Sequence, residues 1–347
     1  MRLKLWTVLL LAVLLGANTL PPTAANAPSQ QTWPVSTPEA QGMDSTLLAE
    51  AVRQFSQQDL YEIHSLHIIR NGTLVTEAYF YPYEAGYTHD LASVTKSVMA
   101  TLIGAAIQQG YIQDVQQPVL SFFEDRTIAH LDEYKRAMTI ENLLTMRSGL
   151  DCTNHPAEAT LFEMMSTPDW VQFTLDLPMT DAPGSRFVYC SSNVHLLAAI
   201  LQAATGQPLL DFARTALFEP LGIAEIIWPT DPQGLPHGWG DLHLRPEDMA
   251  KLGQLYLEGG IWNGQQLLPP DWVQAATQIP ADFESNEWAE GEGYGYLWWL
   301  RSGAYFAQGR GGQMVAVLPE FDLVVALTGG GGPAQLEVAY QILIDYI

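Results

Sequence analysis

Ser93-Val94-Thr95-Lys96 stands at the start of a long apolar segment that continues through Ile107 and stops at Gly110. Apolar residues occupy nearly every side of this segment, so the sequence predicts a buried helix over residues 93–109. On that helix Ser93 and Lys96 lie one turn apart on one face. A serine hydroxyl becomes a nucleophile when a base takes its proton, and a lysine kept neutral by burial can be that base. The alternative is a helix-capping serine followed by a surface lysine.

Lysine is scarce in this chain, which makes the serine–lysine spacing informative. Of the four lysines (Lys4, Lys96, Lys135 and Lys251), only Lys96 has a serine three residues before it. The N–H groups at the start of a helix stabilise negative charge. The backbone N–H of Ser93 could therefore hold the oxyanion that forms when the hydroxyl attacks a carbonyl group.

The first 27 residues have the parts of a secretory signal peptide. Arg2 and Lys4 precede an apolar run from Leu5 to Leu15, and small residues follow up to Ala27. The apolar run is about 11 residues long, too short to span a bilayer comfortably. We expect cleavage near Ala27 and a periplasmic or extracellular protein, with no membrane association beyond this segment. The alternative is an uncleaved anchor.

The charge of the chain restricts its partners. The formal net charge is −23, and removal of the leader would make the chain more negative by two charges. Such a protein is a poor partner for nucleic acid or an anionic membrane surface. A hydrophobic content of 48% is ample for a packed core. We expect one domain over residues 28–347.

Strand-like runs occur towards both ends of the chain. Residues 64–70 and 74–81 flank Asn71-Gly72, a strong signal for a tight hairpin. The middle of the chain is mostly helical. Further strands and a closing helix are expected at 294–301, 305–308, 313–318, 323–328 and 335–347. This order predicts an α+β fold in which strands from about 64–81 and 294–328 form one sheet, with a helical lobe at about 93–280 inserted between them.

Histidine chemistry offers a different enzyme class, the Ser-His-Asp hydrolases. No Gly-x-Ser-x-Gly sequence occurs, which argues against the α/β-hydrolase version. His195 lies in an apolar helical segment, where we expect a structural role, and His89 is a candidate pocket residue. His64 and His67 would face opposite sides of a strand, so we expect no metal site there.

Six motifs, in this order and spacing, resemble those of serine hydrolases related to class C β-lactamases, penicillin-binding carboxypeptidases and 6-aminohexanoate-dimer hydrolase. The motifs are Leu91–Ser97, Leu143–Leu150, Pro183–Cys190, Arg245–Ala250, Tyr294–Trp299 and Gly309–Gln313. The resemblance extends from about His64 to the C-terminus. It implies a β-lactamase/transpeptidase-like fold with Ser93 and Lys96 as the catalytic pair.

The second motif of that family, Tyr-x-Asn, corresponds to Tyr189-Cys190-Ser191. The resemblance implies that Tyr189 shares the proton transfer with Lys96; the alternative is a core tyrosine. Ser191 stands where the family often has Asn, and Asn193 follows two residues later. Both are candidate substrate-binding residues, and the change from Asn disfavours β-lactams as the default substrate.

The third motif, Lys-Thr-Gly or His-x-Gly, corresponds to Ala307–Gly309. Ala307 carries no cation, so Gln308 or Arg310 becomes the candidate for binding a substrate carboxylate or carbonyl. Glycines let backbone N–H groups approach a substrate closely, and one N–H near Arg310 is the expected second oxyanion donor. The alternative is a plain glycine turn. The glycines are Gly309, Gly311 and Gly312.

Two cysteines, Cys152 and Cys190, permit one disulfide in an exported protein; the alternative is two free thiols. Within the resemblance the bond would tie two segments that line the site. It would close a loop of about 38 residues, worth roughly 3–4 kcal/mol in the chain-entropy model.

The sequence therefore predicts an exported serine hydrolase that cleaves a small ester or amide through an acyl-enzyme on Ser93. β-Lactams and D-amino-acid peptides remain within this substrate class. We expect no metal and no organic cofactor. A non-catalytic penicillin-recognising or scaffold protein of the same fold is the alternative. The oligomeric state stays open.

Overall fold

The computed structural model describes residues 32–57, 62–153, 158–280, 292–332, 339–342, 345 and 347. The predicted signal peptide lies outside the described residues, as does much of the helix predicted at 335–347.

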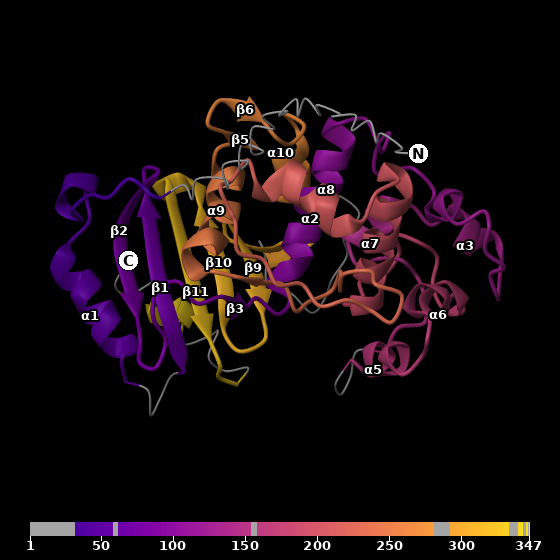
Figure 1. The fold of residues 1–347 in the computed structure, drawn as a ribbon, viewed down its shortest axis with the longest axis horizontal. Helices are drawn as coiled ribbons and strands as arrows, with labels where there is room; N and C mark the ends of the chain where they lie inside the picture. The colour runs from indigo at the N-terminus through magenta and orange to yellow at the C-terminus, as the bar shows by residue number, and fades with distance from the viewer. Residues whose placement is uncertain are drawn as a thin grey trace, which may run out of the picture.

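The described elements form an antiparallel sheet and a set of helices, several of which pack against it (Figure 1). The helices are α1 (Ser45–Phe55), α2 (Val94–Gln108), α3 (Glu133–Ala137), α4 (Ile140–Leu144), α5 (Ala159–Met165), α6 (Trp170–Asp176), α7 (Ser191–Thr205), α8 (Leu209–Ala213), α9 (Pro246–Leu257) and α10 (Trp272–Ala276). The strands are β1 (Ile63–Arg70), β2 (Thr73–Tyr79), β3 (His89–Asp90), β4 (His243–Leu244), β5 (Ile261–Trp262), β6 (Gln265–Gln266), β7 (Glu292–Tyr294), β8 (Trp299–Arg301), β9 (Ala304–Gly309), β10 (Gln313–Leu318) and β11 (Leu323–Gly329). Short helical turns occur at Glu39–Gln41, Val119–Phe122, Arg214–Phe218 and Pro319–Phe321.

The main sheet has seven strands in the order β2-β1-β11-β10-β9-β8-β7, and the neighbouring strands run antiparallel. The N-terminal hairpin thus pairs with the C-terminal strands through β1 and β11. Small two-stranded ladders join β3 to β4 and β5 to β6. The predicted α+β fold, with one sheet built from both ends of the chain, is confirmed.

The Asn71-Gly72 hairpin forms between β1 and β2. Asn71 has φ 51° and Gly72 has φ 67°, and two consecutive positive φ values are what a type I′ turn requires. Asn and Gly are the residues that adopt this conformation at least cost.

The two faces of the sheet are covered differently. On one face α1 packs through Leu48, Ala51 and Phe55. On the other face α9 approaches the strands closely at Gly253, where a Cβ would lie 2.6 Å from Val324 Cγ1 and 2.7 Å from Val315 Cγ1. Figure 1 shows α9 beside the sheet and the helices α2, α7 and α6 extending away from it.

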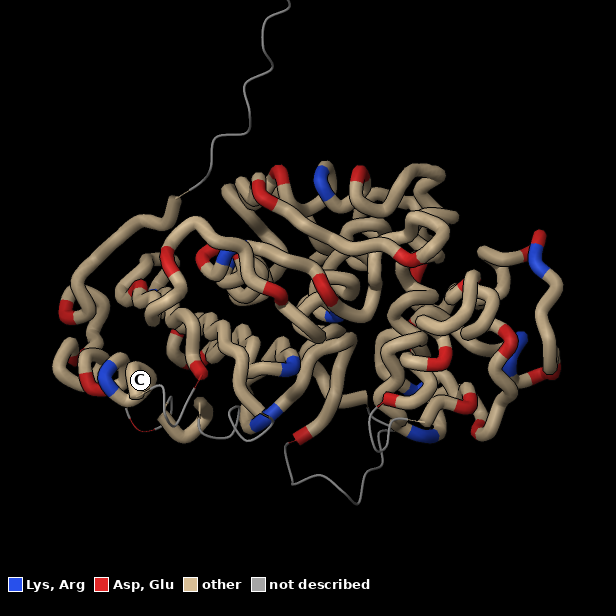
Figure 2. The backbone as a smooth tube through the Cα atoms, turned by 60° about the horizontal axis from the view of Figure 1, so that its bottom comes forward, with Lys and Arg blue, Asp and Glu red and all other residues tan. Residues whose placement is uncertain are grey.

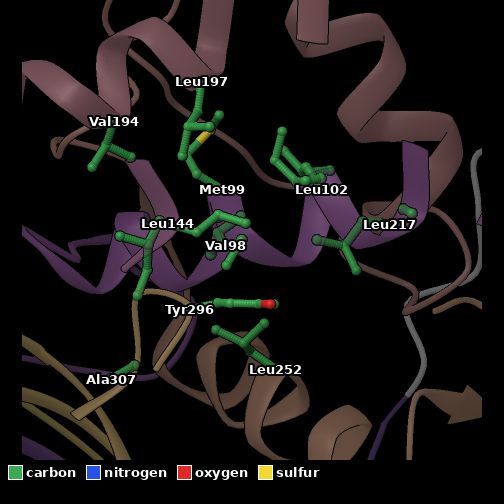
Figure 3. Close-up of a cluster of buried hydrophobic side chains, with 14 of the residues drawn as sticks. Val98, Met99, Leu102, Leu144, Val194, Leu197, Leu217, Leu252, Tyr296 and Ala307 are labelled. Carbon is green, nitrogen blue, oxygen red and sulfur yellow. The ribbon is translucent and has the colours of Figure 1, made fainter. Parts of the chain in front are cut away.

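Helix α2 is the centre of the larger core. Residues 94–106 of this helix are all buried, as expected for a helix that is apolar nearly all round. Figure 3 shows side chains from other elements converging on it. The labelled contributors are Leu144, Val194, Leu197, Leu217, Leu252, Tyr296 and Ala307. A serine at the start of this helix therefore stands on a rigid support.

The strand predicted at 294–301 is wrong in one respect, because it is divided into β7 and β8 by a turn. A Cβ on Gly295 would lie 2.0 Å from the carbonyl oxygen of Ala276, so this position accepts only glycine. Leu297 has φ 59°, which strand geometry does not allow. Packing against α10 bends the chain where the sequence pattern reads as continuous.

The acidic residues are distributed over both halves of the molecule (Figure 2). Among the described helices, none is by itself long and apolar enough to cross a membrane; the bent pair Ser191–Thr205 and Leu209–Phe218 meets the length and composition requirements together.

Candidate active site

Ser93 is the N-cap residue of α2, and its hydroxyl makes no capping hydrogen bond. The preceding residue, Ala92, has φ 44°, a left-handed conformation that costs a non-glycine residue about 1 kcal/mol. The Asp90 side chain holds this turn by accepting a hydrogen bond from Ala92 N at 2.8 Å. The turn leaves the Ser93 side chain partly accessible at the end of a buried helix.

Lys96 lies one turn along the same helix and is 1% exposed. Its Nζ is 2.9 Å from Ser93 Oγ and 2.7 Å from the carbonyl oxygen of Trp239. Since a carbonyl oxygen can only accept, one N–H of Lys96 is directed at Trp239. This contact orients the amine towards the serine hydroxyl.

Tyr189 faces the same amine from the segment before α7. The Lys96 Nζ lies 5.0 Å from the centroid of the Tyr189 ring. That ring stacks on Trp299, with centroids 5.9 Å apart, and meets Tyr294 edge-on at 6.4 Å. Burial, together with the nearby Tyr189, raises the pKa of Tyr294, so Tyr294 stays neutral. Two aromatic side chains, Trp299 and Tyr294, thus fix the position of the Tyr189 ring.

The predicted disulfide is present and anchors the Tyr189 segment. Cys152 and Cys190 are bonded, with Cα atoms 6.0 Å apart and a sequence separation of 38 residues. Cys190 directly follows Tyr189 and is the N-cap residue of α7. The bond therefore ties the residue next to Tyr189 to the loop that follows α4.

The β9–β10 turn closes on Ser93 from the sheet. A Cβ on Gly309 would lie 3.0 Å from Ser93 N and 2.6 Å from the carbonyl oxygen of Leu91, so only glycine permits this approach. Gly311 and Gly312 have φ values of 86° and 91°. Among the described residues, the N–H groups of Ser93 and Arg310 donate to no backbone carbonyl. These two N–H groups remain available for an oxyanion.

Gln313 stabilises this turn, although no sequence pattern marks its side chain as functional. Its amide donates to the carbonyl oxygens of Arg310 at 3.1 Å and Gly329 at 2.6 Å, and its Oε1 accepts from Gly329 N at 3.1 Å. The side chain is 3% exposed. A buried glutamine with three hydrogen bonds fixes both the turn and the adjacent end of β11.

The structure separates Gln308 from Arg310, the two residues predicted to replace the cation of the third motif. Along β9, Ala307 and Gly309 face α2, so Gln308 points to the opposite face of the sheet. There it lines a cavity of about 290 Å³ together with Trp299 and Tyr340. The structure therefore does not bring Gln308 to Ser93, whereas Arg310 is exposed in the turn beside it.

Ser191 and Asn193 are both buried in the first turn of α7. The Ser191 hydroxyl is hydrogen-bonded to the carboxylate of Glu158, a partly buried residue that the sequence did not single out. The side-chain amide of Asn193 is buried without a hydrogen-bond partner among the described residues. Neither side chain makes a described contact with Ser93 or Lys96.

His195, His89 and His64 are held by hydrogen bonds within the fold. His195 is fully buried in α7, and its Nε2 pairs with Asp231 Oδ2 at 3.2 Å. His89 Nε2 lies 2.7 Å from His64 Nδ1, and its Nδ1 donates to the carbonyl oxygen of Asp90 at 2.9 Å. Within the described ranges, no three His, Cys, Asp or Glu side chains are grouped closely enough to hold a metal ion.

Comparison with known proteins gives the same family as the sequence motifs around Ser93, Tyr189 and Gly309. The curated 6-aminohexanoate-dimer hydrolase of Paenarthrobacter ureafaciens is 23% identical over 218 residues, which cover 60% of this chain and 55% of that protein. The chain thus matches little more than half the length of this relative. Esterase EstB of Burkholderia gladioli is 28% identical over 146 residues, covering 39% of this chain and 37% of the esterase.

The fold has close counterparts among solved structures. EstCE1, described as a hydrolase with promiscuous acyltransferase activity, superposes with a TM-score of 0.71 at 18% identity. The superposition covers 86% of this chain and 98% of EstCE1. At this identity the likeness establishes the fold alone. The family model described as Beta-lactamase matches residues 48–341. The chain therefore belongs to the β-lactamase family.

Proposed function

We propose that this protein is an exported serine hydrolase that cleaves a small ester or amide through an acyl-enzyme on Ser93. Membership of the β-lactamase family, with relatives named hydrolase and esterase, supports a serine hydrolase. The observation that carries the proposal is the 2.9 Å contact between Lys96 Nζ and Ser93 Oγ at the start of a buried helix. A base within hydrogen-bond reach of the proton that it takes is the geometric requirement for this chemistry.

In the proposed reaction Ser93 Oγ bonds to the substrate carbonyl carbon while Lys96 takes the hydroxyl proton, with Tyr189 sharing this transfer. The N–H groups of Ser93 and Arg310 stabilise the resulting oxyanion. The intermediate collapses and expels the alcohol or amine, which receives the proton. Water then attacks the acyl carbon with the same groups acting as base, and the acid leaves as the Ser93 hydroxyl is restored.

Two departures from the family motifs favour simple esters or amides over β-lactams. Ser191 replaces the Asn of the second motif, and its hydroxyl is already bonded to Glu158. Ala307 replaces the cation of the third motif and is fully buried against the α2 core. A 6-aminohexanoate-dimer hydrolase and an esterase among the relatives are consistent with amide and ester substrates.

Intact-mass measurement after treatment with a fluorophosphonate tests the proposal. The wild-type protein should gain one adduct, on Ser93, and Ser93→Ala should gain none. An unmodified wild-type protein, or an equal adduct on Ser93→Ala, would overturn it and favour the non-catalytic alternative. Hydrolysis of short-chain p-nitrophenyl esters compared with nitrocefin would then rank esters against β-lactams.

Export is a separate part of the proposal and rests on the leader-like residues 1–27. Expression in a bacterium with a periplasm should yield a mature protein whose N-terminus, read by mass spectrometry, lies near Ala25 or Ala27. Recovery of the full-length chain from the cytoplasm would contradict export without affecting the hydrolase proposal.

A further inference from the structure

Residues 237–241 form the segment that supplies the acceptor for Lys96. Trp239 contributes the carbonyl oxygen, 2.7 Å from Lys96 Nζ, and stands between Gly238 and Gly240. Glycine leaves the backbone with wide conformational freedom. A carbonyl flanked by two glycines therefore needs other contacts to keep it aimed at the lysine.

Close packing explains the glycine at position 238, whereas a Cβ at position 240 would make only an ordinary van der Waals contact. A Cβ on Gly238 would lie 2.3 Å from the carbonyl oxygen of Val194, and one on Gly240 would lie 3.7 Å from that of Ala92. The segment passes between α7 and the turn before α2. Gly238 permits this passage, but neither glycine adds stiffness of its own.

A side-chain bridge closes the segment across its two ends. His237 Nδ1 lies 2.8 Å from Asp241 Oδ2, and because a carboxylate only accepts, the histidine donates. The His237 ring stacks on the Trp239 ring with centroids 5.1 Å apart and planes 17° apart. The Trp170 ring also packs against the His237 ring, with centroids 4.9 Å apart. The bridge and the stacked rings hold the residue whose carbonyl faces Lys96.

The backbone of His237 is itself anchored. Its N–H donates to the Pro229 carbonyl at 2.9 Å, and its carbonyl accepts from Trp228 Nε1 at 2.8 Å. At the other end Asp241 has φ 62°, a conformation that Asp tolerates better than most residues. The bridge thus connects one fixed end to one strained end, with the Trp239 carbonyl between them.

A second His–Asp pair contacts residues 237–241 from α7. His195 Nε2 is 3.2 Å from Asp231 Oδ2, and His195 Nδ1 accepts a long hydrogen bond, 3.5 Å, from Gly238 N. Burial lowers the pKa of His195, so the ring is neutral and carries its proton on Nε2. His195 supports the segment from α7 and has no contact with Ser93 in the structure.

We propose that His237 and Asp241 are positioning residues, which act through the Trp239 carbonyl to orient Lys96 towards Ser93. The inference rests on the proposed function, because it assigns a role in activating Ser93. It concerns side chains outside the three family motifs, and neither residue touches the serine.

The test uses the second-order rate constant for fluorophosphonate labelling of Ser93, measured across pH on the full protein. His237→Phe keeps an aromatic ring against Trp239 but removes the donor, and Asp241→Gly keeps the left-handed backbone but removes the acceptor. Each should lower the plateau rate constant by about ten- to a hundredfold. The pH profile should also differ from that of the wild type, because the Trp239 carbonyl is one of the two hydrogen-bond partners of the Lys96 amine. His237→Asn, which retains an N–H near the position of Nδ1, should recover most of the rate.

The control is Arg126→Gln, which removes a 2.8 Å ion pair with Asp169 in the same lobe without touching residues 237–241. Loss of folded protein lowers the amount labelled but leaves the rate constant of the folded fraction unchanged, so partial unfolding does not mimic the expected result. Equal rate constants and pH profiles for wild type, His237→Phe and Asp241→Gly would overturn the positioning role. Absence of labelling in the wild type would instead overturn the proposed function.

Discussion

The starts of α2 and α3 share one arrangement but differ in their chemistry. In each, a polar N-cap residue is followed three residues later by a buried lysine: Ser93 and Lys96 in α2, Asp132 and Lys135 in α3. The Asp132 carboxylate caps its helix by accepting from Lys135 N at 2.8 Å. The Ser93 hydroxyl caps nothing and lies 2.9 Å from Lys96 Nζ.

The acceptors around the two amines differ as well. Lys135 Nζ donates to three carbonyl oxygens, those of Ala129, Leu175 and Leu177, at 2.9, 2.9 and 2.6 Å. Carbonyls only accept, so they suit the three N–H donors of an ammonium group and leave no route for proton uptake. Lys96 has one carbonyl and one hydroxyl, and a hydroxyl can also donate. Burial and spacing are therefore common to both lysines, and the partner groups decide which one can act as a base.

The largest expected effect comes from removing the amine at the start of α2. Lys96→Met should lower the rate constant for Ser93 acylation by about 10²–10⁴-fold, since the serine loses its general base. The methionine fills a similar volume, so a cooperative unfolding transition should persist. Labelling kinetics and thermal unfolding measure the two quantities. Near-wild-type acylation would mean that another group takes the proton.

The matched change at the start of α3 should affect stability instead. Lys135→Met leaves three buried carbonyls without their donor, which should lower the free energy of unfolding by about 3 kcal/mol or more. The acylation rate constant of the folded protein should stay at the wild-type value. Urea unfolding followed by fluorescence, with labelling kinetics on the same sample, checks both. A large loss in rate constant with unchanged stability would end the distinction between the two lysines.

The sheet side of the Ser93 region can be perturbed without touching either lysine. Gly309→Ala places a Cβ within 3.0 Å of Ser93 N, so the turn must move away. We expect acylation to slow by about a hundredfold, as for a catalytic group displaced by about 1 Å. Gly332→Ala is the control, since a Cβ there meets nothing within 4 Å. Similar acylation rates for both variants would show that the close approach of Gly309 is not required.

The smallest effect is expected from pH, through His64 in β1, whose ring contacts His89 in β3, the strand before Ser93. Burial, with His89 adding to it, lowers the pKa of His64 from 6.5 to about 4. Below about pH 6.5 the unfolded chain therefore binds a proton that the folded protein does not, and the free energy of unfolding falls until about pH 4. Urea unfolding of wild type and His64→Gln across this range should show the smaller decline in His64→Gln. Parallel declines would exclude His64 as the source.

Local patterns predicted the parts of the site that depend on neighbours in sequence. The Ser93–Lys96 pair follows from helix periodicity, and the β1–β2 hairpin follows from Asn71-Gly72, because both depend on a few adjacent residues. Strand alternation predicts the face on which Gln308 lies, since Gly309 next to it faces Ser93. The family motif places Gln308 and Gly309 together, whereas strand alternation directs them to opposite faces of the sheet.

The other features of the site and of the fold depend on contacts between residues far apart in the sequence. The Trp239 carbonyl is 143 residues from Lys96 along the chain, and no side-chain pattern marks a backbone acceptor. Glu158 reaches Ser191 across 33 residues, and Gln313 was visible only as the end of a motif. The break between β7 and β8 results from the packing of Gly295 on α10, a tertiary constraint that strand-like composition does not reveal.

The Cys152–Cys190 bond has a consequence for proteolysis. It makes the chain between these residues, which includes α5 and α6, a closed covalent ring. A single peptide-bond cut inside the ring leaves both fragments joined. A nicked protein would therefore migrate as one species on a non-reducing gel and as two after reduction. Until the bond is reduced, the fragment that carries Ser93 would also keep its covalent link to the one that carries Tyr189.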